Sequence, residues 1–240
     1  MSAARGNDWR RQIARRVCNH TLLKGSATVI GIAVFLAAYF WVLRHPIGAV
    51  TTMPMLALDR WVAFEFAAMP LYLSLWLYLS LGPALLPDRR ALLDYGIACS
   101  AIAGVGLAIF LLWPTQVPQL AADVAAHAGM ATLRSVDLSG NACPSLHVAF
   151  AVFAAFSLAR ELRAVAAPAW LRAVNGLWCA GIVYSTLATR QHVVLDVLAG
   201  ILLGGVVAAL HAHWEHRLAR RPLPATAPPR QARSATPAGD

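Results

Sequence analysis

The sequence contains few charged residues. Asp, Glu, Lys and Arg occupy 13% of its 240 positions, whereas they make up about a quarter of a typical soluble domain. Hydrophobic residues occupy 59% of the positions and gather in long runs, which are characteristic of helices that cross a lipid bilayer. The composition therefore excludes an ordinary soluble domain, and a chain of this length is expected to form one compact helical domain.

Cysteine is also scarce. The four cysteines, Cys18, Cys99, Cys143 and Cys179, have no paired metal-ligand spacing and cannot form a dense disulfide framework. We therefore expect no disulfide and no zinc site. Three histidines near the carboxyl terminus, His211, His213 and His216, lie at the inner end of the last apolar run. Polar and aromatic residues are expected at such an interface, so no metal site is predicted there either.

Acidic residues are fewer than basic ones, 11 against 20, which gives a net charge of +9. Of the 20 basic residues, 11 precede the first apolar run or follow the last, and they are not interleaved with aromatic residues as in a nucleic-acid-binding motif. We therefore exclude nucleic acid as a partner. Basic residues that flank apolar runs mark the cytoplasmic side of a membrane protein and attract anionic lipid head groups.

Six segments are long and apolar enough to cross a bilayer. They are approximately residues 27–43, 61–81, 93–113, 145–159, 170–187 and 192–213. Inside lipid, every backbone polar group needs a partner within its own segment, so these segments must be helices. The predicted fold is all-α: a polytopic membrane helix bundle with six transmembrane helices.

The distribution of basic residues predicts the orientation. With the amino terminus inside, 16 of the 20 Lys and Arg residues lie on the inner side, which places both termini in the cytoplasm. We expect a protein of the bacterial inner membrane whose first apolar run is an anchor and not a cleaved signal. The predicted organisation is a basic segment (1–24), a six-helix domain (25–216) and a disordered tail (217–240) rich in Pro, Ala and Arg.

Ionisable residues within membrane helices are costly and often functional. His192 and Asp196 lie at the start of the sixth run and are four residues apart, so they share one face of a helix. A carboxylate beside a histidine fixes its tautomer and stabilises its positive charge, as a histidine nucleophile or base requires. Arg190 adds a cation suited to a phosphate. The alternative is a structural pair at the membrane interface.

A second pattern, GNACPSLH at residues 140–147, lies directly before the fourth run. Ser145 is expected to cap the following helix, since Pro144 ends any upstream helix. A helix amino terminus carries unpaired N–H groups and the positive end of the helix dipole, so it binds anions. His147 lies in the first turn, where it can donate a proton to a phosphate ester oxygen. The alternative is an ordinary capped helix with an interfacial histidine.

The predicted topology joins these two patterns, because the fourth and sixth runs both begin at the outer face. The sequence PSLH (144–147) followed by His192-x-x-x-Asp196 resembles the type 2 phosphatidic acid phosphatase superfamily of membrane phosphatases and phosphotransferases. The strings CPSLHVA (143–149), TRQHVVLD (189–196) and WPTQVP (113–118) look most like its inositol-phosphorylceramide-synthase-like branch. The resemblance covers approximately residues 53–205.

This resemblance implies a role for each matching residue. His192 would attack phosphorus and become phosphohistidine, with Asp196 orienting its ring. His147 would protonate the leaving alcohol and then activate the acceptor. Ser145 and nearby backbone N–H groups would hold the phosphate oxygens, and Arg190 would balance their charge. The scheme requires no metal and no cofactor.

The sequence departs from the common family pattern in three places. Leu146 replaces a glycine, and Ser185-Thr186 stands where Ser-Arg is usual, so Arg190 is the nearest substitute for that arginine. The first family motif, Lys and then Arg-Pro after six residues, is absent.

Further candidates for contact with the phosphate come from the outer loops. They are Arg60, Arg134 and Asn141. The loop of about 30 residues that contains Arg134 is long for a simple connection and is predicted to contribute to a lid over the lipid head group.

The sequence thus predicts a membrane lipid phosphatase or phosphotransferase that acts on a lipid phosphate at the outer face. It predicts neither the lipid, nor the choice between water and an alcohol as acceptor, nor the oligomeric state. The alternative is a non-catalytic membrane protein, a transporter-like or scaffold bundle, in which the two histidines need not share a site.

Overall fold

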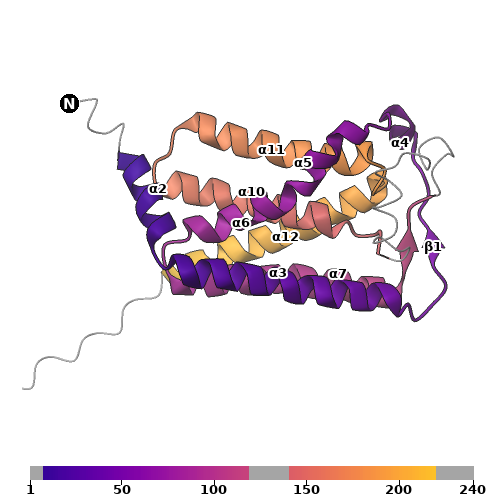
Figure 1. Cartoon of the computed structure of the whole chain (residues 1–240), viewed down its shortest axis with the longest axis horizontal. Helices are drawn as coiled ribbons and strands as arrows, with labels where there is room; N and C mark the ends of the chain where they lie inside the picture. The colour runs from indigo at the N-terminus through magenta and orange to yellow at the C-terminus, as the bar shows by residue number, and fades with distance from the viewer. Residues whose placement is uncertain (1–7, 119–140, 220–240) are drawn as a thin grey trace, which may run out of the picture.

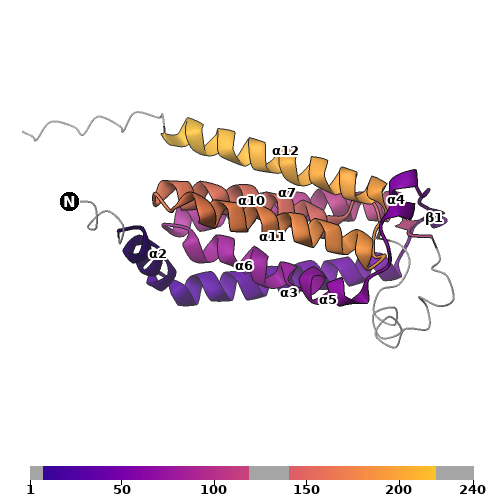
Figure 2. The ribbon, with the colours of Figure 1, turned by 90° about the horizontal axis from the view of Figure 1, so that it is seen from above.

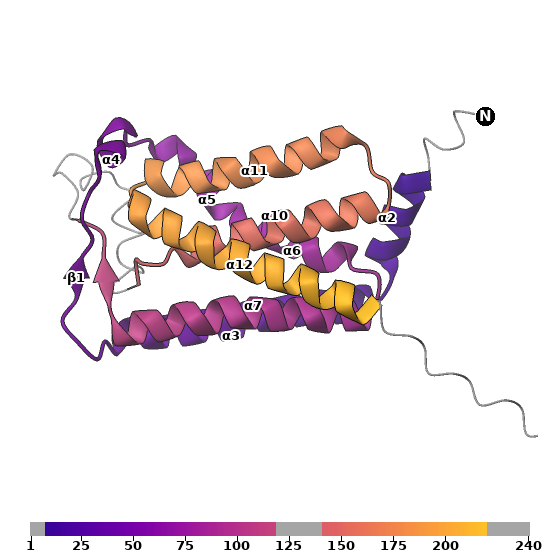
Figure 3. The same ribbon diagram turned by 180° about the vertical axis from the view of Figure 1, so that it is seen from behind.

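The computed structural model describes residues 8–118 and 141–219, which form a bundle of long helices lying side by side (Figure 1). Figures 2 and 3 show the same bundle from above and from behind. Its elements, in chain order, are α2 (Asp8–Cys18), α3 (Thr21–Arg44), β1 (Thr51–Thr52), α4 (Ala57–Trp61), the 3-10 helix η1 (Phe66–Ala68), α5 (Met69–Leu73), α6 (Leu75–Leu85), α7 (Arg89–Leu112), β2 (Thr115–Gln116), α10 (Leu146–Ala164), α11 (Ala169–Ala188) and α12 (Val194–Ala219).

Four helical stretches are long and apolar enough to cross a membrane. They are Thr21–Arg44, Phe66–Leu85, Arg89–Leu112 and Val194–Arg217. Together they indicate an integral membrane protein, in agreement with the composition. The prediction of six transmembrane helices is met only in part, because α10 and α11 form where spans were expected but are not among these four stretches.

α10 lies inside the bundle. α10 packs against α6, α7, α11 and α12, so protein and not lipid surrounds most of its length. Its buried residues include Val148, Ala149, Ala151 and Phe153, none of which is more than 1% exposed. Small residues on this helix let its neighbours approach closely, which is how membrane helices associate.

α12 makes the closest approach to α10. A methyl group added at Gly200 would collide with the carbonyl oxygen of Ser145, and one at Gly204 would collide with that of Ala149. Two small residues four positions apart are typical of close packing between membrane helices, and these contacts show such packing. The contact fixes the start of α10 against the first half of α12.

The two ends of the bundle differ in structure. At one end β1 and β2 form a short parallel pair beside α4, and a bridge between Thr115 and Asn141 brings the segment before α10 to the same place (Figure 1). α2 lies across the opposite end, where α12 also finishes (Figure 3). The predicted tail lies outside the described residues from position 220 onward, as does the long loop at 119–140.

Ion pairs and capping contacts hold α2 to the bundle. Arg16 Nη1 lies 2.6 Å from Glu161 Oε2 and donates to the carbonyl of Leu85 at 3.3 Å. Lys24 Nζ donates to the carbonyls of Arg16 at 2.6 Å and Ala84 at 3.1 Å. These basic side chains therefore bind helix carboxyl ends, as the helix dipole favours.

Candidate active site

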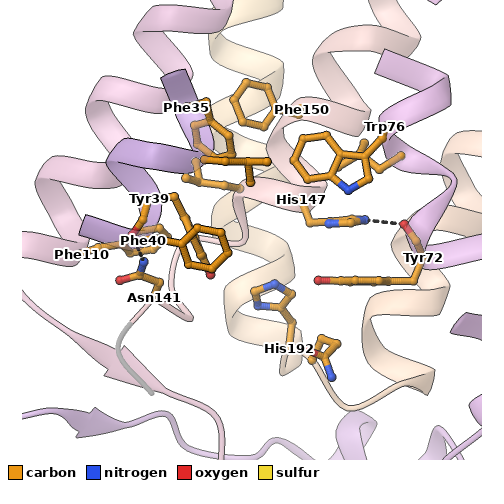
Figure 4. Close-up of a pocket in the computed structure, with 14 residues that line it drawn as sticks. Phe35, Tyr39, Phe40, Tyr72, Trp76, Phe110, Asn141, His147, Phe150 and His192 are labelled. Atoms are coloured by element: carbon orange, nitrogen blue, oxygen red, sulfur yellow. Dashed lines mark hydrogen bonds between the residues drawn. The ribbon is translucent and has the colours of Figure 1, made fainter. Parts of the chain in front are cut away.

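His147 and His192 line one cavity of about 320 Å³ near the end of the bundle that carries β1 and α4 (Figure 4). The cavity lies between α3, α5, α6, α7 and the start of α10. Half of its 14 lining residues are Phe, Tyr or Trp: Phe35, Tyr39, Phe40, Tyr72, Trp76, Phe110 and Phe150. Asn141 and Gln191 add polar groups, while no Lys or Arg belongs to the lining that residues 8–118 and 141–219 provide.

His192 precedes α12 and faces a buried carboxylate. Its Nδ1 lies 3.5 Å from Asp196 Oδ2, and Asp196 is fully buried. The backbone N–H of His192 donates to the carbonyl of Thr186 at 3.1 Å. Because Nδ1 faces the carboxylate, a proton on Nδ1 leaves the Nε2 lone pair available to react. The predicted reach between His192 and Asp196 is therefore confirmed, although His192 precedes α12, so the two residues do not share a helix face as expected.

Asp196 also holds the start of α12. Its Oδ2 accepts a hydrogen bond from the N–H of Val193 at 3.0 Å, while its carbonyl oxygen accepts from the N–H of Ser145 at 3.0 Å. His192 Nδ1 and Asp196 Oδ1 have no hydrogen-bond partner among the described residues. Buried polar atoms without partners are costly and rare, so the pair retains unused hydrogen-bonding capacity beside the cavity.

His147 is held by Tyr72. The two rings are stacked, with centroids 3.9 Å apart and planes inclined by 8°. His147 Nε2 also lies 2.8 Å from the carbonyl oxygen of Tyr72 (Figure 4). A carbonyl oxygen can only accept, so Nε2 carries a hydrogen, and Nδ1 is the nitrogen that exchanges a proton.

Ser145 is the N-cap of α10, as predicted. Its side chain is fully buried and its Oγ accepts a hydrogen bond from the N–H of Val148 at 3.3 Å. Ser145 does not line the cavity, but its neighbours Leu146 and His147 do. The start of α10 is thus the part of the backbone that meets the cavity.

Leu146, which replaces the glycine of the common family pattern, fits against α7. Its side chain occupies the space beside Gly106, where an added methyl group would collide with it. Leu146 is only 4% exposed. The larger side chain at position 146 therefore fits because Gly106 on the facing helix has no side chain.

Arg190 does not reach the cavity. Its Nη1 donates to the carbonyl of Asp59 and its Nη2 to the carbonyl of Val62, both at 2.7 Å. The guanidinium therefore binds the backbone at α4. To contact a phosphate, as the sequence predicts, it would have to exchange these hydrogen bonds for phosphate oxygens.

The other predicted phosphate contacts have different positions. Asn141 lines the cavity, and its Nδ2 donates to the carbonyl of Tyr39 at 3.3 Å. Arg60 lies in α4 with an exposed side chain. Arg134 lies outside the described residues.

Two residues of the site were not predicted from the sequence. Tyr72 was not singled out, since an aromatic residue in an apolar run carries no signal for a histidine partner. Asp59 stands where an acidic residue is expected at the membrane interface, yet it is 2% exposed and its carboxylate accepts from the N–H of Val194 at 2.8 Å. An acidic residue next to an apolar run was the available signal.

No group of three or more His, Cys, Asp or Glu side chains that could hold a metal ion occurs within residues 8–118 and 141–219. His211 instead lies 3.6 Å from Glu215 and 3.3 Å from the guanidinium of Arg160.

Comparison with known proteins connects this geometry to a family. The searches of curated proteins and of solved structures found no significant match. The family model of the PAP2 superfamily matches residues 95–220, which is more than half of the chain. The matched region contains His147, His192 and Asp196. By this match, the chain belongs to the PAP2 superfamily.

Proposed function

We propose that this protein is a lipid phosphatase or phosphotransferase that acts at the outer face of its membrane and forms a phosphohistidine at His192. Membership of the PAP2 superfamily already indicates phosphatase or phosphotransferase activity on a phosphate ester. The observation that carries the proposal is that His147 and His192 line one cavity, with the carboxylate of Asp196 behind His192. This is the arrangement of a nucleophile with an orienting carboxylate and a separate proton donor.

In the first step, His192 Nε2 attacks phosphorus, and the bond from phosphorus to the leaving oxygen breaks. The leaving alkoxide takes a proton from Nδ1 of His147, which retains its Nε2 hydrogen on the carbonyl of Tyr72. The phosphorylated His192 ring keeps its Nδ1 hydrogen toward Asp196. The negative carboxylate thus offsets the charge that the ring gains.

In the second step, an acceptor hydroxyl attacks the phosphohistidine. Nδ1 of His147, now without a proton, removes the hydrogen of that hydroxyl, and the bond between nitrogen and phosphorus breaks. The step restores both histidines to their starting protonation states. Water as acceptor gives a phosphatase, and an alcohol gives a phosphotransferase. The sequence motifs favour the branch that resembles inositol-phosphorylceramide synthase.

The wall of the cavity supports a lipid as the substrate. Phe35, Tyr39 and Phe40 of α3 and Trp76 of α6 give it an apolar, aromatic surface next to the two histidines. Such surfaces bind hydrocarbon through the hydrophobic effect. A small polar phosphate ester would gain no binding energy from contact with this apolar wall.

The distribution of basic residues supports a site at the outer face. Arg16, Lys24 and Arg160 belong to the end of the bundle opposite the cavity, and such residues accumulate on the cytoplasmic side. We propose that α10 and α11 cross the bilayer with the other four helices, within the bundle. We propose that the protein resides in a bacterial inner membrane, with both termini in the cytoplasm.

For the phosphate oxygens we propose the backbone at the start of α10, beside the N-cap Ser145, and the side chain of Asn141. A helix amino terminus attracts anions, and Asn141 lines the cavity. For Arg60 and Arg134, contact with the phosphate remains a prediction. A contact between Arg190 and the phosphate would compete with the hydrogen bonds that Arg190 donates to the backbone at α4.

The test is an activity panel with protein purified in detergent. Phosphatidic acid, phosphatidylglycerophosphate, a polyprenyl diphosphate and phosphatidylinositol are each supplied with and without an alcohol acceptor. We expect phosphate release or head-group transfer from at least one of them, and loss of both in His192→Ala. Equal background for the wild type and the variant across the whole panel would overturn the proposal and favour a non-catalytic membrane protein.

A further inference from the structure

The short segment that carries His192 is bound on both sides to a distant part of the chain. Arg190, two residues before His192, has a left-handed backbone conformation with φ of 58°. Its guanidinium donates to the carbonyls of Asp59 and Val62, each at 2.7 Å. A residue other than glycine adopts this conformation at a cost, so surrounding contacts must maintain it.

The carboxylate of Asp59 binds the other side of the same segment. Its Oδ1 accepts from the N–H of Val194, the first residue of α12, at 2.8 Å, and its Oδ2 accepts from the N–H of Leu56 at 2.7 Å. The Asp59 side chain thus joins the start of α12 to the segment before α4. The N–H groups at the start of a helix lack partners within it, so a buried carboxylate there is strongly favoured.

Two carboxylates therefore share the start of α12. Asp196 Oδ2 takes the N–H of Val193, and Asp59 takes that of Val194. Asp59 uses both carboxylate oxygens, whereas an asparagine has one acceptor oxygen. With asparagine at position 59, one of the N–H groups of Leu56 and Val194 loses its acceptor, and the connection between the start of α12 and the segment before α4 is broken.

We propose that Asp59 and Arg190 form an interlock that positions His192 for attack, and that both are positioning residues without contact to the phosphate. The inference rests on the proposed role of His192 as nucleophile. It assigns a task to Asp59, which lies outside residues 95–220 that match the family. It also gives Arg190 a different role from the one that its sequence neighbourhood predicts.

The test compares Asp59→Asn and Arg190→Ala with matched controls. Asp88→Asn changes another N-cap, whose Oδ1 accepts from Ala91 N–H at 2.9 Å. Arg172→Ala removes another guanidinium bound to a backbone carbonyl, that of Ala167 at 2.8 Å. Kinetics are measured with the lipid of the panel above that turns over fastest, and inorganic phosphate serves as a competitive probe of the site.

We expect kcat to fall at least about tenfold in Asp59→Asn and Arg190→Ala, because small displacements of a reacting group are costly. KM and inhibition by inorganic phosphate should stay within about twofold, since uniform binding is retained. The double variant should be barely slower than either single variant, because both break one interlock. Asp88→Asn and Arg172→Ala should keep kcat.

Three outcomes would overturn the interlock. The first is an unchanged kcat in both Asp59→Asn and Arg190→Ala. A raised KM and weaker phosphate inhibition in Arg190→Ala, with Asp59→Asn normal, would make Arg190 a phosphate contact. Loss of turnover together with phosphate inhibition in both variants would make the pair a requirement for folding.

Hydrogen–deuterium exchange separates the interlock from the proposed function. Asp59→Asn should speed exchange within residues 189–197 and leave the amide groups of α7 unchanged, whether or not a lipid is turned over. Unchanged exchange at residues 189–197 would overturn the interlock. If the wild type shows no turnover that is lost in His192→Ala, the proposed function is overturned and the interlock is not.

Discussion

A histidine and an acidic residue four positions later lie near each end of α12. At the end beside the cavity, His192, just before the helix, has its Nδ1 3.5 Å from Asp196 Oδ2, and at the opposite end His211 Nε2 lies 3.6 Å from Glu215 Oε1. The spacing and the distances are nearly the same. The surroundings of the two pairs differ.

Arg160 accompanies the pair of His211 and Glu215. Its guanidinium lies 3.0 Å from Glu215 and 3.3 Å from His211 Nδ1, so the carboxylate already has a cation as its partner. The pair of His192 and Asp196 lies beside a cavity whose lining, within the described residues, includes no Lys or Arg. A histidine and a carboxylate at this spacing thus form a structural pair or a reactive one according to what lies beside them.

The largest expected effect contrasts the two histidines. His192→Ala should lower turnover at least about a thousandfold, because the variant lacks the nucleophile. The turnover of His211→Ala should stay within about twofold of that of the wild type. Steady-state turnover of the lipid phosphate measures both, and a large loss in His211→Ala would contradict the contrast.

The next effect contrasts the two carboxylates. Asp196→Asn should lower kcat about a thousandfold, since the neutral amide still accepts from Val193 N–H but cannot stabilise a charged His192 ring. Glu215→Gln should leave kcat unchanged, because Glu215 is far from the cavity. Retention of kcat in Asp196→Asn would remove the orienting role of the carboxylate.

His147 is expected to act only where the leaving group needs a proton. His147→Ala should lower hydrolysis of an alkyl phosphate ester about a hundredfold. It should lower hydrolysis of p-nitrophenyl phosphate much less, because p-nitrophenolate leaves without protonation. Equal losses with both substrates would mean that His147 binds the phosphate and does not donate a proton.

A smaller effect concerns the packing between α10 and α12 next to the cavity. Gly200→Ala should destabilise the protein by about 1–3 kcal/mol, because the methyl group collides with the backbone at Ser145. Gly205→Ala meets no atom within 4 Å and should leave the thermal midpoint in detergent unchanged or slightly higher. Equal midpoints for the two variants would show that α10 and α12 can separate without cost.

The smallest effect is expected at the cysteine nearest to Asp196. Burial, together with the adjacent carboxylate of Asp196, raises the pKa of the Cys143 thiol to about 11. The reactive thiolate is therefore scarce at neutral pH and becomes abundant only as the pH approaches that value. Turnover at pH 7 should survive treatment with iodoacetamide, and rapid inactivation there by modification of Cys143 would contradict this.

Patterns of short range were predictable. The N-cap at Ser145, the reach between His192 and Asp196, and the close packing at Gly200 and Gly204 each depend on a few neighbouring positions along a helix. The meeting of His147 and His192 followed from topology, since both segments were expected to begin at the same face. The cavity that they line is consistent with that prediction.

Contacts between distant segments were not predictable. Tyr72 and Asp59 lie in the stretch between the first and third long helices. Nothing in their own sequence indicates that Tyr72 meets His147 or that Asp59 meets the N–H of Val194. The role predicted for Arg190 came from its nearness to His192 along the chain. The direction of its side chain depends instead on where the backbone at α4 lies.

The sequence by itself determined that the chain forms apolar helices and that two histidines and an aspartate begin two of them at one face. Hydropathy and helical spacing are local properties, so a single chain reveals them. Only the tertiary structure decided what surrounds each polar group. The cavity beside His192 and the cation beside His211 come from other helices, and they separate two pairs with almost the same spacing into different roles.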